Sequence, residues 1–440
     1  MTTGRQIARK IFQKTLASLD ISLVMERKIQ WEGSSLVLTD ARIDLKTVER
    51  AVVIAIGKAA HAMVEGLSAL VPGHLPITGV VTATTPPRMP VSGLRYFVSG
   101  HPLPNAESLQ SAEAILRLLQ SADERTLVIF LLSGGGSALM ELPLSPAITL
   151  NDVQETYQAL VTCGAPIEAM NTVRKHISAV KGGRLAVAAG RAQKITLAIT
   201  DVPAGKESAL ASGPTLPDPT TIADVERVLA QYGLREKFPP ALRNWLTSGQ
   251  MPETPKPGDA AFANAHFHLL LGMDDLFHAA HHAAEAHGFV TCCDNSTDDW
   301  LVEKAAEYLL EQLEGWQREN PGEPVALIAD GEVSSPVTGK GVGGRNSAFV
   351  LACAQKIAGR NITVLSAGTD GIDGNSPAAG AVADGETISR ARSLGLDPAA
   401  AFRDSDAHSF FAALEDAVIT GPTGNNLRDL RVLLMDGHGK

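Results

Sequence analysis

Short apolar runs that alternate with helical patterns constrain the fold of this chain most strongly. The runs span residues 51–56, 77–82, 127–132, 195–200, 265–271, 289–293, 325–329, 362–366 and 431–435. Strand-length runs separated by helical segments predict parallel βαβ units whose strands are buried on both faces. We therefore expect an α/β fold. It consists of an N-terminal Rossmann-like α/β/α sandwich with a parallel sheet, followed by a smaller C-terminal α/β domain.

A proline-rich stretch at residues 239–257 divides this pattern and is typical of a linker. It predicts an N-terminal domain at residues 1–255 and a C-terminal domain at residues 256–440. In α/β sheets, ligands bind beyond the carboxyl ends of the strands. Residues with unusual chemistry follow strands in both halves of the chain, so we expect an active site in the cleft between the two domains.

The charge and composition exclude several classes of partner. The 38 Lys and Arg residues are outnumbered by 48 Asp and Glu residues, and no long basic run occurs, so we expect no nucleic acid partner. The most apolar stretch is far shorter than the about twenty residues of a membrane span. The N-terminus lacks the apolar core of a signal peptide, and the four cysteines form no disulfide framework. These features predict a cytoplasmic protein without a membrane partner.

Two glycine-rich loops each follow a strand and precede a helix. The first consists of Ser133, Gly134, Gly135, Gly136 and Ser137. The second spans residues 339–346 and contains Lys340, Gly343, Gly344, Arg345 and Asn346. Neither loop has the spacing of a Walker loop or of a dinucleotide fingerprint. Glycines let backbone N–H groups approach an anion, so we predict that both loops bind phosphate. A tight turn and a solvated loop are the alternatives.

Cationic side chains gather in residues 170–184, whose pattern predicts a helix. The side chains expected on one face of it are Asn171, Arg174, Lys175, Ser178 and Lys181. Such a face suits an anionic ligand, so we predict that Arg174, Lys175 and Lys181 bind substrate or phosphate; a solvated surface is the alternative. His101 lies in a rigid turn after a strand, and we predict that it faces the ligand.

Four carboxylates lie shortly after apolar runs: Asp201, Glu332, Asp370 and Asp373. Mg²⁺ binds a few carboxylates together with phosphate oxygens. We predict that Asp370, Asp373 and Glu332 form the metal site and that Asp201 holds the ion or positions a substrate hydroxyl. The alternative for each aspartate is a turn cap.

These segments together resemble the glycerate kinases that carry a C-terminal MOFRL domain, a class also known as TtuD-type hydroxypyruvate reductases. The similar segments follow one another along almost the whole chain and include AIGKAA (55–60), SGHPLP (99–104), LLSGGGSALM (131–140), NTVRKHISAVKGGRLA (171–186), GKGVGGRNSAFVLA (339–352) and SAGTDGIDGNSPAAGAV (366–382). The resemblance places the MOFRL region at about residues 323–435.

The resemblance implies a glycerate 2-kinase, which uses ATP and Mg²⁺ to convert D-glycerate to 2-phosphoglycerate. It also implies that Lys58 and Arg345 are the leading catalytic residues. Phosphoryl transfer depends mainly on positioning and charge neutralisation. We therefore expect Lys58 to hold glycerate and the transferring phosphoryl group, and Arg345 to neutralise its equatorial oxygens. Nothing in the sequence sets the oligomeric state, and a homodimer is one option.

The alternative function is an NAD(P)H-dependent hydroxypyruvate reductase. That chemistry calls for a dinucleotide fingerprint followed by an acidic residue, which residues 57–60 do not provide. A non-catalytic ligand-binding protein is a third option, but it would not need so many clustered cations and carboxylates. The turns at residues 271–274 and 293–299 depart from the family pattern, so the resemblance leaves the nucleotide preference open.

Overall fold

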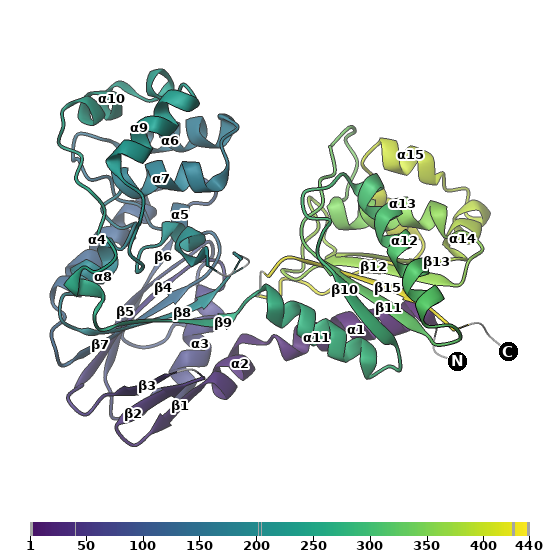
Figure 1. Ribbon diagram of the computed structural model, residues 1–440, viewed down its shortest axis with the longest axis horizontal. Coiled ribbons are helices and arrows are strands. Elements are labelled where there is room, and N and C mark those ends of the chain that lie inside the picture. Colours follow the sequence, from purple (N-terminus) through teal and green to yellow (C-terminus); the bar gives the residue numbers. More distant parts are fainter. Residues whose placement is uncertain (1–2, 40, 201, 204, 425–426, 438–440) are drawn as a thin grey trace. The chain divides into compact units, whose positions relative to one another are not determined.

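The computed structural model describes residues 3–39, 41–200, 202–203, 205–424 and 427–437. The chain forms two compact units, whose elements are labelled in Figure 1. The large unit is Ile21–Leu271, and the small unit combines Met1–Asp20 with Gly272–Lys440. Each unit has its own six-stranded sheet, which confirms the predicted α/β class.

The main sheet of the large unit is parallel throughout. Its strands are β4 (Arg50–Ile56), β5 (Ile77–Ala83), β6 (Leu94–Val98), β7 (Thr126–Leu132), β8 (Gln193–Ile199) and β9 (Ala265–Leu271). They lie in the order β6-β5-β4-β7-β8-β9. The almost purely apolar β4 and β7 are central because their side chains are buried on both faces. The shorter edge strand β6 has a mixed pattern and is not among the apolar runs, although a strand was expected before the turn that holds His101.

Helices cover this sheet, and a small antiparallel sheet precedes it. The helices are α2 (Ile21–Lys28), α3 (Ala60–Leu70), α4 (Ala106–Gln120), α5 (Gly136–Leu139), α6 (Leu150–Thr162), α7 (Ile167–Ile177), α8 (Arg184–Ala188), α9 (Ile222–Gln231) and α10 (Pro240–Thr247). The small sheet consists of β1 (Ile29–Glu32), β2 (Ser35–Leu38) and β3 (Ala41–Asp44). In Figure 1, α6, α7, α9 and α10 gather at one end of the unit, where they share a separate hydrophobic core. We call these four helices the cap.

The predicted helix at residues 170–184 is wrong in its second half. α7 ends at Ile177, and Ser178 then pairs with Pro143 as an isolated bridge. Gly182 and Gly183 adopt left-handed backbone angles, which a helix does not allow. The predicted cationic face is therefore split between a helix and a turn.

The predicted linker at residues 239–257 is part of the large unit. It contains α10, whose Leu242, Trp245 and Leu246 are buried in the core of the cap. Further along, Thr254 donates a hydrogen bond to the buried Asp218. The run at residues 265–271 then completes the main sheet as β9. The division between the units thus falls after Leu271, later than the expected boundary at residue 255.

The sheet of the small unit is mixed. Its strands are β10 (Val290–Asp294), β11 (Val325–Asp330), β12 (Ile362–Gly368), β13 (Gly380–Asp384), β14 (Ala417–Val418) and β15 (Asp429–Met435). They lie in the order β10-β11-β15-β12-β13-β14, and β15 is antiparallel to both of its neighbours. Apolar character predicted β11, β12 and β15 but carried no information on strand direction.

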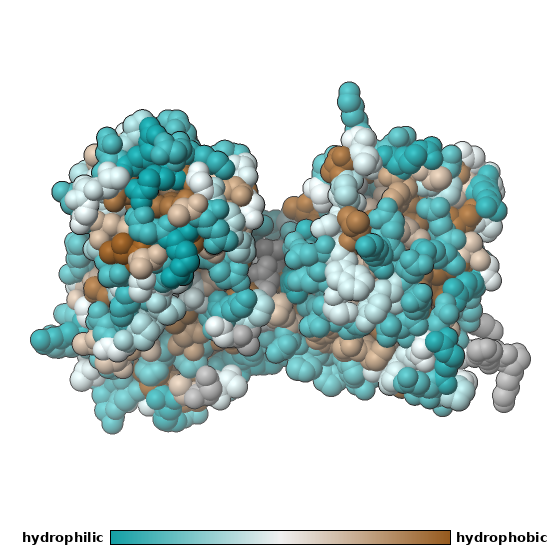
Figure 2. Space-filling view, turned by 45° about the horizontal axis from the view of Figure 1, so that its top comes forward, coloured by the Kyte–Doolittle hydropathy of each residue, from teal (hydrophilic) through white to brown (hydrophobic). Residues whose placement is uncertain are grey.

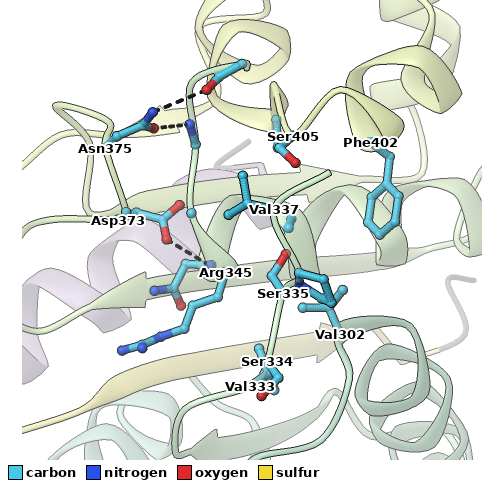
Figure 3. Close-up of a pocket in the computed structure, with 18 of the residues that line it drawn as sticks. Val302, Val333, Ser334, Ser335, Val337, Arg345, Asp373, Asn375, Phe402 and Ser405 are labelled. Carbon is cyan, nitrogen blue, oxygen red and sulfur yellow. Dashed lines mark hydrogen bonds between the residues drawn. The ribbon is translucent and has the colours of Figure 1, made fainter. Parts of the chain in front are cut away.

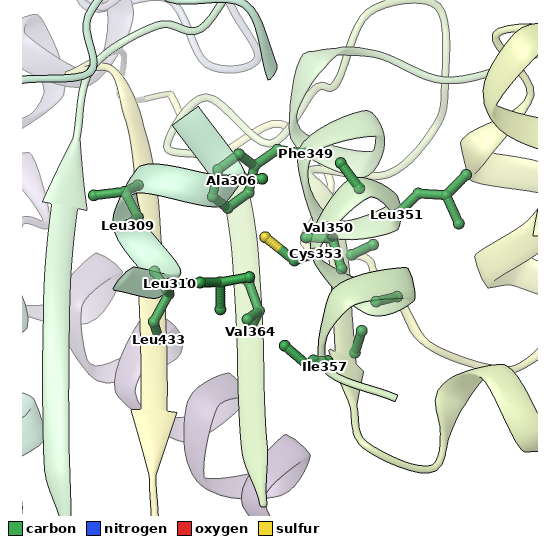
Figure 4. Packing of buried hydrophobic residues seen from close by; sticks show 14 of the residues in the cluster. Ala306, Leu309, Leu310, Phe349, Val350, Leu351, Cys353, Ile357, Val364 and Leu433 are labelled. Atoms are coloured by element: carbon green, nitrogen blue, oxygen red, sulfur yellow. The ribbon is translucent and has the colours of Figure 1, made fainter. Parts of the chain in front are cut away.

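Helices pack on both faces of this sheet. They are α1 (Gly4–Ser18), α11 (Met273–Glu285), α12 (Val302–Glu319), α13 (Arg345–Lys356), α14 (Thr387–Ser393), α15 (Pro398–Arg403) and α16 (Ala407–Ala413). Figure 4 shows α12 and α13 packed over the strands through Leu309, Phe349, Cys353, Val364 and Leu433. The N-terminal helix α1 packs against α11, β12 and β15, which explains why the first residues of the chain belong to the small unit.

The face of the molecule shown in Figure 2 is largely hydrophilic. On the face shown in Figure 2, apolar side chains occur in small scattered groups. Among the described residues, no helix combines the length and the apolar character needed to cross a membrane.

A buried ion pair fastens the cap to the rest of the large unit. The Lys181 amine is fully buried and donates to Glu141 Oε2 at 2.6 Å and to the Met140 carbonyl at 3.0 Å. The hydroxyl of Tyr157, on α6 of the cap, donates to the same carboxylate. Burial lowers the pKa of Lys181, although the Glu141 charge opposes this. Each charge is therefore tolerated only because the other is present.

We expect Lys181→Met to lower the free energy of unfolding by about 3–5 kcal/mol, because it leaves the Glu141 charge buried without its partner. Lys206→Met is the control, since Lys206 and Glu168 form an exposed pair that contributes little. Urea denaturation measures both variants. The double variant Lys181→Met with Glu141→Gln should recover part of the loss. Equal unfolding midpoints for Lys181→Met and Lys206→Met would contradict this account.

Candidate active site

The loops after β4 and β7 interlock at the carboxyl end of the large sheet. A Cβ on Gly57 would lie 2.1 Å from Ser133 Oγ, so only glycine fits there. The amide of Lys58 donates to the Gly134 carbonyl at 2.9 Å, and the amide of Ala59 donates to Ser133 Oγ at 3.0 Å. These contacts bring the exposed Lys58 side chain next to the glycine loop.

His101 joins the same group. A Cβ built on Gly135 would lie 3.2 Å from the His101 ring and 3.5 Å from Lys58 Cγ, so the three residues converge. Burial, and then the charge of Lys58, lower the pKa of His101. A neutral imidazole at neutral pH can donate or accept one hydrogen bond with a substrate hydroxyl. The structure thus brings together Lys58, His101 and the loop at 133–137.

The backbone N–H groups of this loop are available. Gly134, Gly135 and Gly136 have no hydrogen-bond acceptor for their amides within the described part of the chain. Successive amides without acceptors suit an anion. Ser137 Oγ, in contrast, is engaged with Ser212 Oγ at 2.8 Å.

Ser212 connects the loop to the cap, and sequence reasoning missed it. Its hydroxyl donates to Asn171 Oδ1 on α7 at 3.0 Å. Ala211 and Ser212 have positive φ angles of 49° and 59°, which non-glycine residues seldom adopt. A Cβ on Gly136 would lie 2.6 Å from Ala211 Cβ, so this segment presses closely on the glycine loop. The pattern of apolar and polar residues in the sequence does not predict such positive φ angles, so this strained segment could not be identified from it.

Of the three predicted anion-binding cations of the cap region, two are neutralised. Lys175 pairs with the buried Asp218 at 3.3 Å, and Lys181 pairs with Glu141. Arg174 is 8% exposed, and its guanidinium lies over the Tyr157 ring at 4.7 Å. Its Nε has no hydrogen-bond partner, and no carboxylate of the described residues pairs with it. Arg174 therefore remains able to bind an anion. Asp201, predicted as catalytic, lies outside the described residues.

In the small unit, two carboxylates fix Arg345 at the start of α13. Arg345 Nε lies 2.5 Å from Asp429 Oδ2, and its Nη2 lies 3.3 Å from Asp429 Oδ1. Nη2 also lies 2.7 Å from Glu332 Oε1. Burial opposes the charge, but the hydrogen bond and charge of Asp429, together with Glu332, raise the pKa of Arg345. The guanidinium is therefore permanently charged and held in one orientation.

The second glycine loop differs from the prediction, because protein groups already occupy the amides of Gly343, Gly344 and Asn346. The amide of Gly343 donates to Asn375 Oδ1 at 2.8 Å, and that of Gly344 donates to Ser347 Oγ at 3.1 Å. The amides of Asn346 and Ser347 both donate to the Asp373 carboxylate at 2.9 Å.

Close packing explains the glycines of this loop. A Cβ on Gly344 would lie 2.3 Å from Asp373 Oδ1, and one on Gly341 would lie 2.4 Å from Asp406 Cβ. Gly343, Gly344 and Asn346 thus present no free backbone donors to a phosphate in this structure. Lys340 is exposed on the same loop.

The three predicted metal ligands differ in how far protein groups already engage their carboxylates. Asp373 uses both oxygens to cap α13, and it accepts a further hydrogen bond from Ser347 Oγ at 2.6 Å. Glu332 is paired with Arg345. Asp370 accepts one hydrogen bond from the Ile372 amide at 3.0 Å and lines a cavity. No group of three metal-binding side chains occurs among the described residues. Asp370 is therefore the predicted ligand that still fits Mg²⁺.

A charged cluster of Asp298, Asp330, Arg428 and Arg431 lies near the end of β11 and was not predicted from the sequence. Asp330, at the end of β11, is buried, and neither of its carboxylate oxygens has a hydrogen-bond partner among the described residues. Burial raises the pKa of Asp330 to about 6, although Arg428 and Arg431 oppose the shift. Asp298 pairs with Arg428. The only sequence feature that could have identified Asp330 is its position directly after the apolar run at residues 325–329.

Comparisons with known proteins agree with this architecture. A domain of unknown function, DUF4147, matches residues 7–247, and the MOFRL family matches residues 325–429. An Agrobacterium vitis protein that carries the name hydroxypyruvate reductase is 35% identical over 98% of this chain and 95% of its own length. The D-glycerate 2-kinase of Thermotoga maritima is 33% identical over 88% of this chain and 91% of its own length.

A solved structure extends this similarity to the fold. The crystal structure of glycerate kinase from Thermotoga maritima superposes with a TM-score of 0.85 at 30% sequence identity and covers 98% of this chain and 99% of its own. The chain therefore belongs to the MOFRL family, together with these glycerate kinases.

Proposed function

We infer that this protein is a glycerate 2-kinase, which phosphorylates D-glycerate to 2-phosphoglycerate. The observation that carries this inference is the exposed Lys58 beside three loop amides without acceptors, in a chain whose relatives are glycerate kinases. A cation and convergent backbone donors suit a small anionic substrate and a phosphoryl group. We propose ATP as the phosphoryl donor.

We propose the following roles for the large unit. Lys58 and the amides of Gly134 to Gly136 hold the anionic oxygens that change charge during transfer. Arg174 binds the glycerate carboxylate, because a buried guanidinium without a counter-ion favours an anionic ligand. The neutral His101 hydrogen bonds to a substrate hydroxyl.

We propose that the guanidinium of Arg345, in the small unit, binds oxygens of the phosphoryl group that is transferred. A guanidinium can contact two phosphate oxygens at once, and here Asp429 fixes its plane. When bound, Mg²⁺ would neutralise charge on the phosphate oxygens. Asp370 is the described residue that we propose as its protein ligand. A cytoplasmic location fits the four free cysteines.

The name of the Agrobacterium vitis relative raises reductase activity as a second candidate. In this chain, however, residues 57–60 lack a dinucleotide fingerprint. The close contact between Gly57 and Ser133 explains why a glycine stands at position 57 without any dinucleotide. One assay separates the two. Purified protein with D-glycerate, ATP and Mg²⁺ should release ADP, whereas hydroxypyruvate with NADH or NADPH should leave the nicotinamide absorbance unchanged. The reverse result would overturn the kinase inference.

Lys58→Ala should lower kcat/KM by about 10²–10⁴, as expected when a group that stabilises transferring charge is removed. The melting temperature should stay near that of the wild type, because the side chain is exposed. Lys46→Ala, which removes another exposed lysine of the large unit, is the matched control and should keep full activity. Activity of Lys58→Ala within about threefold of the control would refute the proposed role.

Arg345→Lys should lose most kinase activity although the charge is kept, because lysine cannot reproduce the planar two-point contact. Asp429→Asn should lower kcat by about tenfold with a smaller change in the KM for glycerate, since it removes the charge that orients Arg345. The matched control is Arg360→Lys, which alters an arginine paired with Glu314 on the surface of the same unit. Equal kcat values for Arg345→Lys and Arg360→Lys would contradict the assignment.

A further inference from the structure

The small unit contains a cavity that is much larger than glycerate requires. Its volume is about 1030 Å³, and it is bounded by residues 333–338, the glycine loop and residues 370–375 (Figure 3). Cavities of several hundred cubic ångströms hold ligands of nucleotide or drug size, whereas glycerate is a three-carbon acid. The size of the cavity therefore indicates a second, larger ligand.

One wall of this cavity is apolar and aromatic. Phe402 from α15 faces it in Figure 3, together with Val302 and Val337. Val337 is 83% exposed and Ile372 is 50% exposed, although both are apolar. Apolar side chains left in water around an aromatic ring suit a flat, weakly polar group such as a nucleobase.

Polar groups and two arginines, Arg345 and Arg403, complete the lining. Ser334, Ser335 and Ser405 place hydroxyl groups around the cavity, and these can hydrogen bond to a base edge or a ribose. Arg345 contributes the fixed positive charge described above. The amides of Gly343, Gly344 and Asn346 already donate to protein groups and are not available to phosphates, whereas the charged guanidinium of Arg345 attracts them.

We propose that this cavity binds the adenosine moiety of the nucleotide, with the base against Phe402 and the phosphates directed toward Arg345. The proposal rests on the kinase function inferred above. It assigns nucleotide binding to the small unit and glycerate binding to the large unit. The carboxylates of Glu303 and Asp370 also line the cavity, so the triphosphate is expected to enter together with its Mg²⁺.

The test is calorimetric titration of the full chain with ATP in Mg²⁺ buffer, and separately with inorganic tripolyphosphate, both without glycerate. Phe402→Leu keeps an apolar side chain but removes the ring face. It should weaken ATP binding about tenfold, as expected for a lost stacking contact, and leave tripolyphosphate binding unchanged. Arg345→Lys should weaken the binding of both ligands. Phe262→Leu, which changes a half-buried phenylalanine of the large unit, is the matched control and should alter neither.

A second variant tests the cavity independently, in case the Phe402→Leu substitution alters folding. Ser335→Trp fills the cavity from a loop and should abolish ATP binding while the melting temperature is kept. The assignment is overturned if the wild type binds ATP and both cavity variants bind it equally well. A wild type that neither binds ATP nor phosphorylates glycerate would overturn the kinase inference itself, and the cavity assignment with it.

Discussion

The close approach of Gly57 to Ser133 is the constraint on which the proposed active site depends. β4 and β7 are adjacent parallel strands, so their carboxyl ends lie side by side. Their two loops can interlock only because no Cβ is present at Gly57. The hydrogen bonds of Lys58 and Ala59 to the neighbouring loop then fix where the lysine side chain begins. A larger residue at position 57 would separate the loops and displace both the cation and the free amides.

The strands were largely predictable because burial on both faces leaves a continuous apolar run in the sequence. The topology of the small unit was not, since β15 inserts antiparallel between β11 and β12 and an apolar run does not encode direction. The boundary after Leu271 was missed for a related reason. β9 is separated from β8 by the cap helices α9 and α10. The proline-rich residues 239–257 contain α10 and pack as part of the large unit, so they are not a linker.

The two glycine loops show why the site was only partly predictable. Both have the composition of an anion-binding loop, and both connect a strand to a helix. In the first, glycines lie against Lys58 and His101 and leave amides without acceptors. In the second, the same residue type allows residues 370–375 and 404–406 to approach closely and take the amides. Glycines in a sequence indicate that another group packs closely against the backbone. The structure is needed to tell whether that group is another segment of the chain or leaves room for a ligand.

Charge pairing separates the cations that can act on a ligand from those that hold the fold. Lys175 and Lys181 are buried against carboxylates, so moving either toward a substrate would leave an unpaired buried charge. Arg345 is also paired, but among the described residues its partners contact Nε and Nη2. They therefore fix its orientation and leave Nη1 available to a ligand. Arg174 has no counter-ion among the described residues. Phosphoryl transfer gains most from charges that are positioned before the substrate arrives. We propose that the two arginines act in this way. The cationic pattern of residues 170–184 did not distinguish Arg174 from the paired Lys175 and Lys181.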